Sequence, residues 1–158
     1  MGRYFLIAAM FLWSASTMAE AVVKSCDATF SAASNNHGSM IIENNGKITG
    51  KVRLDHDIDG GVFSLDDSLL VVYGLPKRVS RKYPQATRLS VYKVSPRPTL
   101  VMNEMYGGGV YDALFSDNQK FVVVENQYGV DVLDLIRRKS KSFDSTYAPY
   151  STQKCHPK

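Results

Sequence analysis

Beyond its first twenty residues, the chain lacks long apolar runs and clear helical periodicity. The longest apolar run, residues 4–13, has about ten residues, whereas a helix that crosses a bilayer needs roughly twenty. We therefore expect no stable membrane insertion. Cysteine is scarce as well, because the 158 residues include only Cys26 and Cys155. Neither has a nearby His or Asn in a pattern typical of a thiol nucleophile.

The N-terminus has the features of a secretory signal peptide. Arg3 precedes the apolar run, and small residues follow around positions 14–21. Cleavage is expected after Ala19, or alternatively after Ala21, which leaves one domain over residues 20–158 and predicts a periplasmic location. The net charge of +4 falls to +3 when Arg3 is removed. An excess this small in an exported protein does not indicate a nucleic-acid partner.

An even number of cysteines in an oxidising compartment predicts a disulfide between Cys26 and Cys155. The bridge would join the two ends of the mature chain. Closing such a long loop stabilises a fold by about 4 to 5 kcal/mol in the chain-entropy model.

Short β-branched and aromatic runs, bounded by Gly, Asn, Asp and Pro, predict an all-β fold. Residues 39–43 and 47–54 flank Asn44-Asn45-Gly46, and Asn-Gly favours a tight hairpin. The strands recur as hairpins, which is typical of propeller blades. Because the chain has room for about three blades, we expect a small antiparallel repeat of hairpins in an open or reduced propeller-like arrangement, with a β-sandwich as the alternative.

One segment occurs twice. Residues 63–72 align without a gap on residues 115–124, and each copy has a Gly-Gly-Val-aromatic run at or just before its start. The second copy turns back after residues 126–129, whereas the first continues through residues 74–88 before the next strand. A loop is therefore inserted into one of two otherwise similar hairpins.

The sequence contains no set of residues typical of a catalytic site, so we expect that the protein is not an enzyme and binds no cofactor. It has no Gly-x-Ser-x-Gly elbow, and its three histidines lack metal-ligand spacing. A weaker pattern is a calcium loop, because oxygen ligands alternate from position 55 and a glycine stands at position 60. Its ligands would be Asp55, Asp57, Asp59 and Asp66. A solvated acidic turn is the favoured alternative, since strands flank this segment.

The inserted loop is the main candidate for function. It contains five Lys or Arg residues and no acidic residue, and Pro76 and Pro84 restrict its backbone. A small polar or aromatic tip inside a basic collar suits an acidic cleft on a protein partner. The predicted partner-binding residues are Lys77, Arg78, Val79, Ser80, Arg81, Lys82 and Tyr83. An ordinary solvated hairpin loop is the alternative.

Residues 60–94 resemble the periplasmic immunity proteins that neutralise type VI secretion peptidoglycan amidases. The resemblance rests on Gly60-Gly61-Val62-Phe63, the Asp66-Asp67 turn, an apolar strand, a protruding loop and a further strand. In that family, a loop enters the cleft of a cysteine-histidine amidase and a loop serine meets the catalytic histidine. The resemblance implies that Ser80 is the tip residue. This chain departs from the family in its longer, strongly basic loop and in having only two cysteines.

These observations together predict an immunity protein that binds a secreted peptidoglycan amidase effector and occludes its active-site cleft with residues 74–88. The alternative is a structural or ligand-binding module of the cell envelope that inhibits nothing. The sequence leaves the oligomeric state open.

Overall fold

A computed structural model describes residues 21–35, 37–78, 86–146 and 151–155. The expected signal peptide therefore lies outside the described residues. Within the described residues, the chain forms three four-stranded antiparallel sheets and no helix long and apolar enough to cross a membrane. The first sheet contains β1 (Val22–Lys24), β2 (Phe30–Ser34), β3 (Ser39–Asn44) and β4 (Lys47–Arg53). The second contains β5 (Gly60–Phe63), β6 (Leu69–Gly74), β7 (Thr87–Lys93) and β8 (Thr99–Tyr106), and the third contains β9 (Val110–Phe115), β10 (Phe121–Asn126), β11 (Gly129–Asp134) and β12 (Lys139–Phe143).

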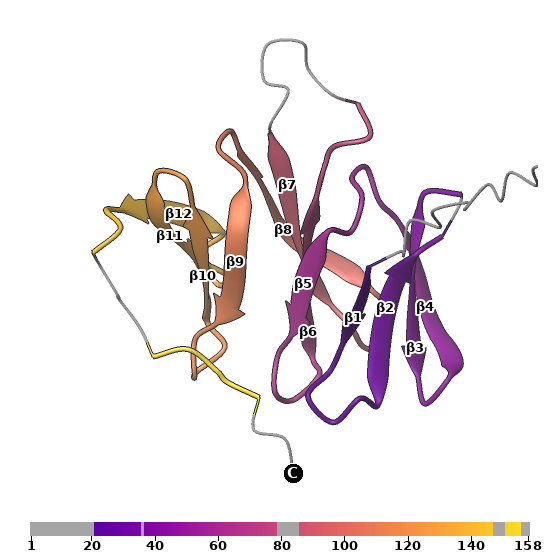
Figure 1. Cartoon of the computed structure of the whole chain (residues 1–158). Helices are drawn as coiled ribbons and strands as arrows, with labels where there is room; N and C mark the ends of the chain where they lie inside the picture. Colours follow the sequence, from indigo (N-terminus) through magenta and orange to yellow (C-terminus); the bar gives the residue numbers. More distant parts are fainter. Residues whose placement is uncertain (1–20, 36, 79–85, 147–150, 156–158) are drawn as a thin grey trace, which may run out of the picture.

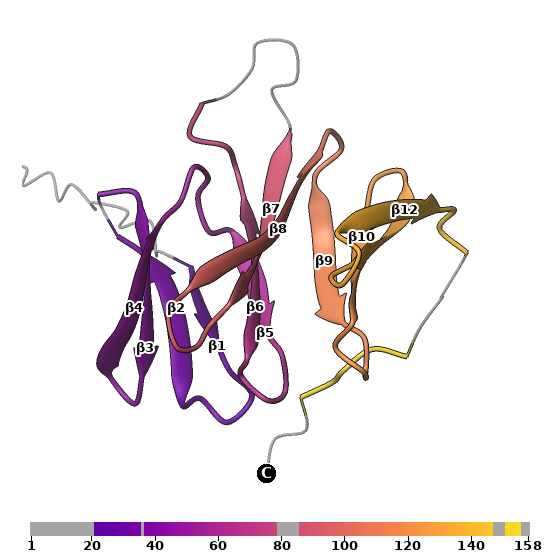
Figure 2. The ribbon, with the colours of Figure 1, turned by 180° about the vertical axis from the view of Figure 1, so that it is seen from behind.

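Each sheet is one blade of an open, propeller-like fan (Figure 1). The strands of a blade follow one another in sequence order, and β5, the first strand of the second blade, contacts both β1 and β9, the first strands of its two neighbours. The view from behind shows the same three blades side by side, with the second blade between the other two (Figure 2). The expected all-β, open propeller-like fold is confirmed, and the two-sheet sandwich is not the fold observed.

The Asn-Gly hairpin forms as predicted. β3 pairs with β4, and Asn45 and Gly46 both have positive φ, at 50° and 75°. This backbone suits the right-handed twist of a hairpin, and Asn and Gly adopt it at low cost.

The duplicated segment forms the turn between the first two strands of a blade, and the structure shows a third copy in the first blade. We call these the inner turns: Ser25–Phe30, Ser64–Leu69 and Ser116–Phe121. In each, the serine hydroxyl donates to the Asp or Asn two residues later at 2.7 to 2.8 Å. The same oxygen accepts the N–H of the closing apolar residue at 2.9 to 3.1 Å. The fourth residue has positive φ in every copy, between 56° and 59°.

Apolar side chains fill the two spaces between the blades. The second blade is buried on both faces, because Leu70 and Val72 face the first blade while Val71 faces the third. All three are fully buried, which explains why β6 reads as a continuous apolar run rather than an alternating one. Each such side chain contributes about 1.5 to 3 kcal/mol by leaving water.

Residues 151–155, which we call the strap, run back across the inner turns. The backbone of Asp117 donates to the Ser151 carbonyl at 3.0 Å, and Gln153 donates from its backbone to the Phe115 carbonyl at 2.8 Å. The Gln153 side chain then reaches the next turn, where its oxygen accepts the Leu65 N–H at 3.0 Å. The strap therefore joins the third blade to the second.

The Cys26–Cys155 disulfide links the strap covalently to the first blade, and the Cα atoms of the two cysteines are 5.4 Å apart. Cys26, Leu65 and Asp117 are equivalent positions, since each directly follows the serine of its inner turn. The pairing of the two cysteines is as expected, and such a bridge is typical of an oxidising, extracytoplasmic environment. The bridge joins the two ends of the mature chain by fastening the first inner turn, rather than a strand, to the tail that follows β12.

Candidate functional site

The inserted loop begins on a fixed support. Residues 75–78, which we call the root, lie against the connection between β4 and β5. The backbone of Asp57 donates to the Leu75 carbonyl at 2.8 Å, and that of Lys77 donates to the Asp55 carbonyl at 2.9 Å. The Asp59 carboxylate accepts the Leu75 N–H at 3.1 Å. The root therefore extends the ladder of β6 and ties the second blade to the first.

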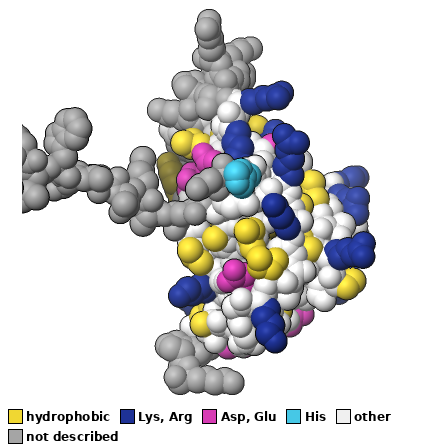
Figure 3. Space-filling model, turned by 90° about the vertical axis from the view of Figure 1, so that its right-hand side faces the viewer, with side chains coloured by type: hydrophobic (Ala, Val, Ile, Leu, Met, Phe, Trp, Pro, Cys, Tyr) yellow, Lys and Arg dark blue, Asp and Glu magenta, His cyan; other side chains and the backbone are white. Residues whose placement is uncertain are grey.

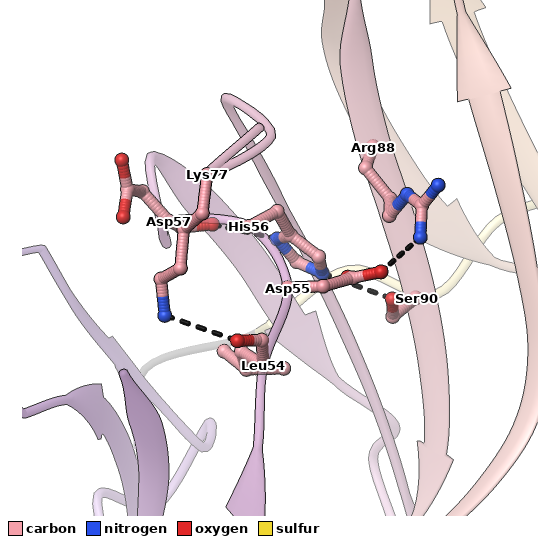
Figure 4. Close-up of polar contacts among 7 residues, drawn as sticks. All are labelled: Leu54, Asp55, His56, Asp57, Lys77, Arg88 and Ser90. Atoms are coloured by element: carbon pink, nitrogen blue, oxygen red, sulfur yellow. Dashed lines mark hydrogen bonds and ion pairs between the residues drawn. The ribbon is translucent and has the colours of Figure 1, made fainter. Parts of the chain in front are cut away.

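A buried histidine holds this support in place. His56 is fully buried beneath the root, and its Nδ1 lies 2.6 Å from the Asp57 carbonyl. Because a carbonyl only accepts, Nδ1 carries the proton, and Nε2 accepts the Ser90 hydroxyl at 2.9 Å. Burial lowers the pKa of His56, which keeps the ring neutral despite the favourable carbonyl and the nearby Asp55 carboxylate. Figure 4 shows the ring between the β4–β5 connection and β7.

A cavity of about 550 Å³ opens between the first and second blades, beside the root. We call it the basic cleft. Its charged lining consists of Arg53 from β4, Lys77 and Arg78 from the root, Arg88 from β7 and a single described acidic residue, Asp55. The remaining lining is mixed, with polar Ser90, Tyr92 and Asn103 and apolar Leu54, Pro76, Leu100 and Met105.

Two of the four cations in the basic cleft are held by protein atoms (Figure 4). Arg88 forms an ion pair with Asp55, and the Lys77 ammonium donates to the Leu54 carbonyl at 3.1 Å while lying over Gly38. Arg53 and Arg78 are exposed, and their side chains form no ion pair or hydrogen bond with another described residue. The cleft therefore combines fixed positive charge with cations that are available to a ligand.

The structure places only part of the predicted partner-binding set. Lys77 and Arg78 lie in the root, and Val79, Ser80, Arg81, Lys82 and Tyr83 lie outside the described residues. Lys77 turns back toward Leu54 rather than standing in an open collar. The sequence interpretation missed Arg53, His56 and Ser90, because they join the root only through contacts between distant parts of the chain.

The four aspartates of the calcium pattern do not form one site. Asp55 pairs with Arg88, and Asp59 accepts the N–H of Leu75. Asp66 lies in the inner turn at the far end of β5, where it accepts hydrogen bonds from Ser64 and Ser68. Within the described ranges, no three His, Cys, Asp or Glu residues lie close enough to hold a metal ion.

A second cavity, of about 300 Å³, lies between the second and third blades. We call it the acidic cleft, because Glu104 and Asp131 line it and its described lining contains no Lys or Arg. Burial, followed by the charge of Asp131, raises the pKa of Glu104. Asn126 donates to Asp131 at 2.9 Å and accepts the Tyr128 N–H at 2.8 Å.

No protein-family model and no curated protein matches this sequence. Among solved structures, the chain is similar to hydrazine synthase of Kuenenia stuttgartiensis, with a TM-score of 0.53 and 16% identity over 82% of this chain and 38% of that one. It is also similar to the WD40 domain of coronin from Toxoplasma gondii, with a TM-score of 0.50 and 14% identity over 78% of this chain and 33% of that one. At these identities the likeness shows the fold alone: the chain is a propeller-like array that spans about a third of the structures it matches.

Proposed function

We propose that this protein is a periplasmic immunity protein that binds a secreted peptidoglycan amidase and occludes its active site with the 74–88 loop. The observation that carries the proposal is the root, where an inserted loop leaves the fold from a support shared by two blades. A binding loop that is fixed at its base loses less conformational entropy when it docks. An inhibitor of this kind needs no chemistry of its own.

The charge around the root supports an acidic partner. Figure 3 looks onto the first blade, where Lys and Arg side chains are spread over the face and acidic ones are sparse. The exposed cations of this blade are Lys24, Lys47, Lys51 and Arg53. Complementary charge speeds encounter and fixes the orientation of a complex, and its effect weakens as salt increases.

The test is binding to, and inhibition of, purified candidate amidase effectors by the mature protein. A variant in which a short Gly-Ser linker replaces residues 79–85 keeps every described contact of the root. We expect loss of capture and of inhibition in this variant. Arg78→Glu should weaken binding by about 1 kcal/mol or more, while Lys139→Glu on the third blade, far from the root, serves as the matched control.

The alternative is a binding module of the cell envelope that inhibits nothing. The basic cleft supports this alternative, since a cavity of about 550 Å³ is of a size that commonly holds small ligands. Capture that does not depend on the loop, or binding to an amidase that stays fully active, would favour the envelope module.

A further inference from the structure

The basic cleft contains an arginine that already binds a carboxylate. Arg88 projects from β7 and pairs with Asp55 from the β4–β5 connection. The Asp55 side chain is 62% exposed and that of Arg88 is 30% exposed, so the pair lies at the surface of the cleft rather than inside the core. A surface pair of this kind contributes little to stability and exchanges readily with another carboxylate.

Further donors surround this pair. Arg53 and Arg78 flank the cleft without a described partner, and the Lys77 ammonium is held at its wall. Planar guanidinium groups bind carboxylates through paired hydrogen bonds. The donor set therefore exceeds what one resident carboxylate can use.

The apolar part of the basic cleft indicates the kind of molecule to which the ligand's carboxylate belongs. Leu100 and Met105 are 44% and 47% exposed, which is high for large apolar side chains, and both line the cleft beside the arginines. They offer contact to the methylene groups of a Glu side chain or to an apolar neighbour in a peptide. At about 550 Å³ the cavity has room for a few residues of an extended chain.

We propose that the basic cleft is a carboxylate-binding site for an acidic peptide segment of a protein partner, and that Asp55 competes with this segment for Arg88. The inference deepens the proposed function, because the acidic segment would belong to the inhibited enzyme. While the loop enters the enzyme, an acidic segment of the enzyme enters the basic cleft. Asp55 lowers the affinity of the empty site and neutralises Arg88 until the partner arrives.

The probe is the blocked peptide acetyl-Gly-Glu-Glu-Leu-Gly-amide, and its control replaces both glutamates with glutamine. Titration is followed by the methyl NMR signals of Leu54, Leu100 and Met105. We expect the glutamate peptide to shift these signals, the glutamine peptide to leave them unchanged, and the affinity to fall with added salt.

Variants separate competition from simple charge attraction. Arg88→Gln should weaken peptide binding about tenfold, because a charge-assisted hydrogen bond is lost. Asp55→Asn should strengthen it about twofold to fivefold, since it frees Arg88 and keeps the backbone carbonyl that accepts from Lys77. Lys139→Gln, on the third blade, should change nothing.

Equal binding of both peptides, or weaker binding in Asp55→Asn, would overturn the inference. Inhibition of an amidase without any binding of the glutamate peptide would also overturn it, while leaving the proposed function intact. Peptide binding that follows the variants as described, without capture of any amidase, would support the site and count against the proposed function.

Discussion

The two clefts between blades share one framework but carry opposite charge. Both lie beside a connection between the second and third strands of a blade, and in both blades an inner turn of the same geometry lies at the other end of the second strand. The basic cleft lies beside the long insertion and is lined by four cations, whereas the acidic cleft lies beside the short β10–β11 turn and is lined by two carboxylates. The repeat thus sets the scaffold, and residues outside the repeat set the binding chemistry.

Beside each cleft, a buried polar side chain holds a connection between strands in place. His56 joins the β4–β5 connection to β7 through Ser90, and Asn126 orders the β10–β11 turn through Asp131 and Tyr128. His56 joins the connection between two blades to the second blade, but Asn126 acts within one blade. The basic cleft therefore depends on contacts between blades to a degree that the acidic cleft does not.

The largest effect is expected from the disulfide, which is part of neither cleft and joins the first blade to the strap. Cys26→Ser opens a loop with a sequence separation of 129 residues, and we expect the free energy of unfolding to fall by about 4 to 5 kcal/mol. Denaturant unfolding measures the loss, and the natural protein with a reductant is the control. Equal stability of the oxidised protein and Cys26→Ser would show that the bridge does not stabilise the fold.

The next effect separates the clefts. His56→Ala removes a fully buried side chain and leaves the Ser90 hydroxyl without its acceptor, so a loss of about 2 to 4 kcal/mol is expected. Asn126→Ala should cost about 1 to 2 kcal/mol, because water can replace its bonds at a more open site. If Asn126→Ala cost as much as His56→Ala in denaturant unfolding, the two anchors would be equivalent and the contrast would fail.

A smaller effect tests the shared scaffold. The Ser25, Ser64 and Ser116 hydroxyls occupy the same place in the three inner turns, and all three residues are buried. Each Ser→Ala change should cost about 1 to 2 kcal/mol, since a backbone N–H loses its side-chain acceptor. Three similar values by denaturant unfolding would support equivalence, and one value near zero would contradict it for that blade.

The smallest effect near neutral pH comes from protonation of His56. Burial makes the pKa of His56 lower in the folded protein than in the unfolded chain. The unfolded chain therefore binds the proton more strongly, and the contribution of neutral His56 to stability is fully present only above about pH 6.5. Stability should fall as the pH drops below this value. His56→Asn should reduce the slope of stability between pH 5 and 7, and the exposed His37 provides the control His37→Asn. A slope unchanged by His56→Asn would assign the pH dependence to other groups.

Local signals predicted much of the fold. The Asn45-Gly46 turn, the apolar strands and the inner turns at Ser64 and Ser116 each depend on residues close in sequence. The first inner turn, Ser25–Phe30, was missed because Ala28 occupies its positive-φ position, at 59°, where Ala is uncommon. The segment keeps Ser25 and Asp27, but its positive-φ position lacks the Asn, Asp or Gly that usually marks such a backbone.

The site was less predictable because it forms between blades. His56 and Ser90 are 34 residues apart in the sequence, and Asp55 and Arg88 are 33 apart. Nothing local marks either residue as a partner of the other. The insertion itself was visible as a difference between two copies, so the sequence located the root but not the cleft beside it.

The strap also sets a limit on how this protein can grow by duplication. From Ser151 to Cys155 the chain can reach about 14 Å when fully extended, and over this reach it already contacts one equivalent position in each of three blades. An added fourth blade would separate the first inner turn from the third, and residues 151–155 would no longer join them. The strap is therefore long enough to join three inner turns and no more, and a change in the number of blades requires a matching change in the length of the tail.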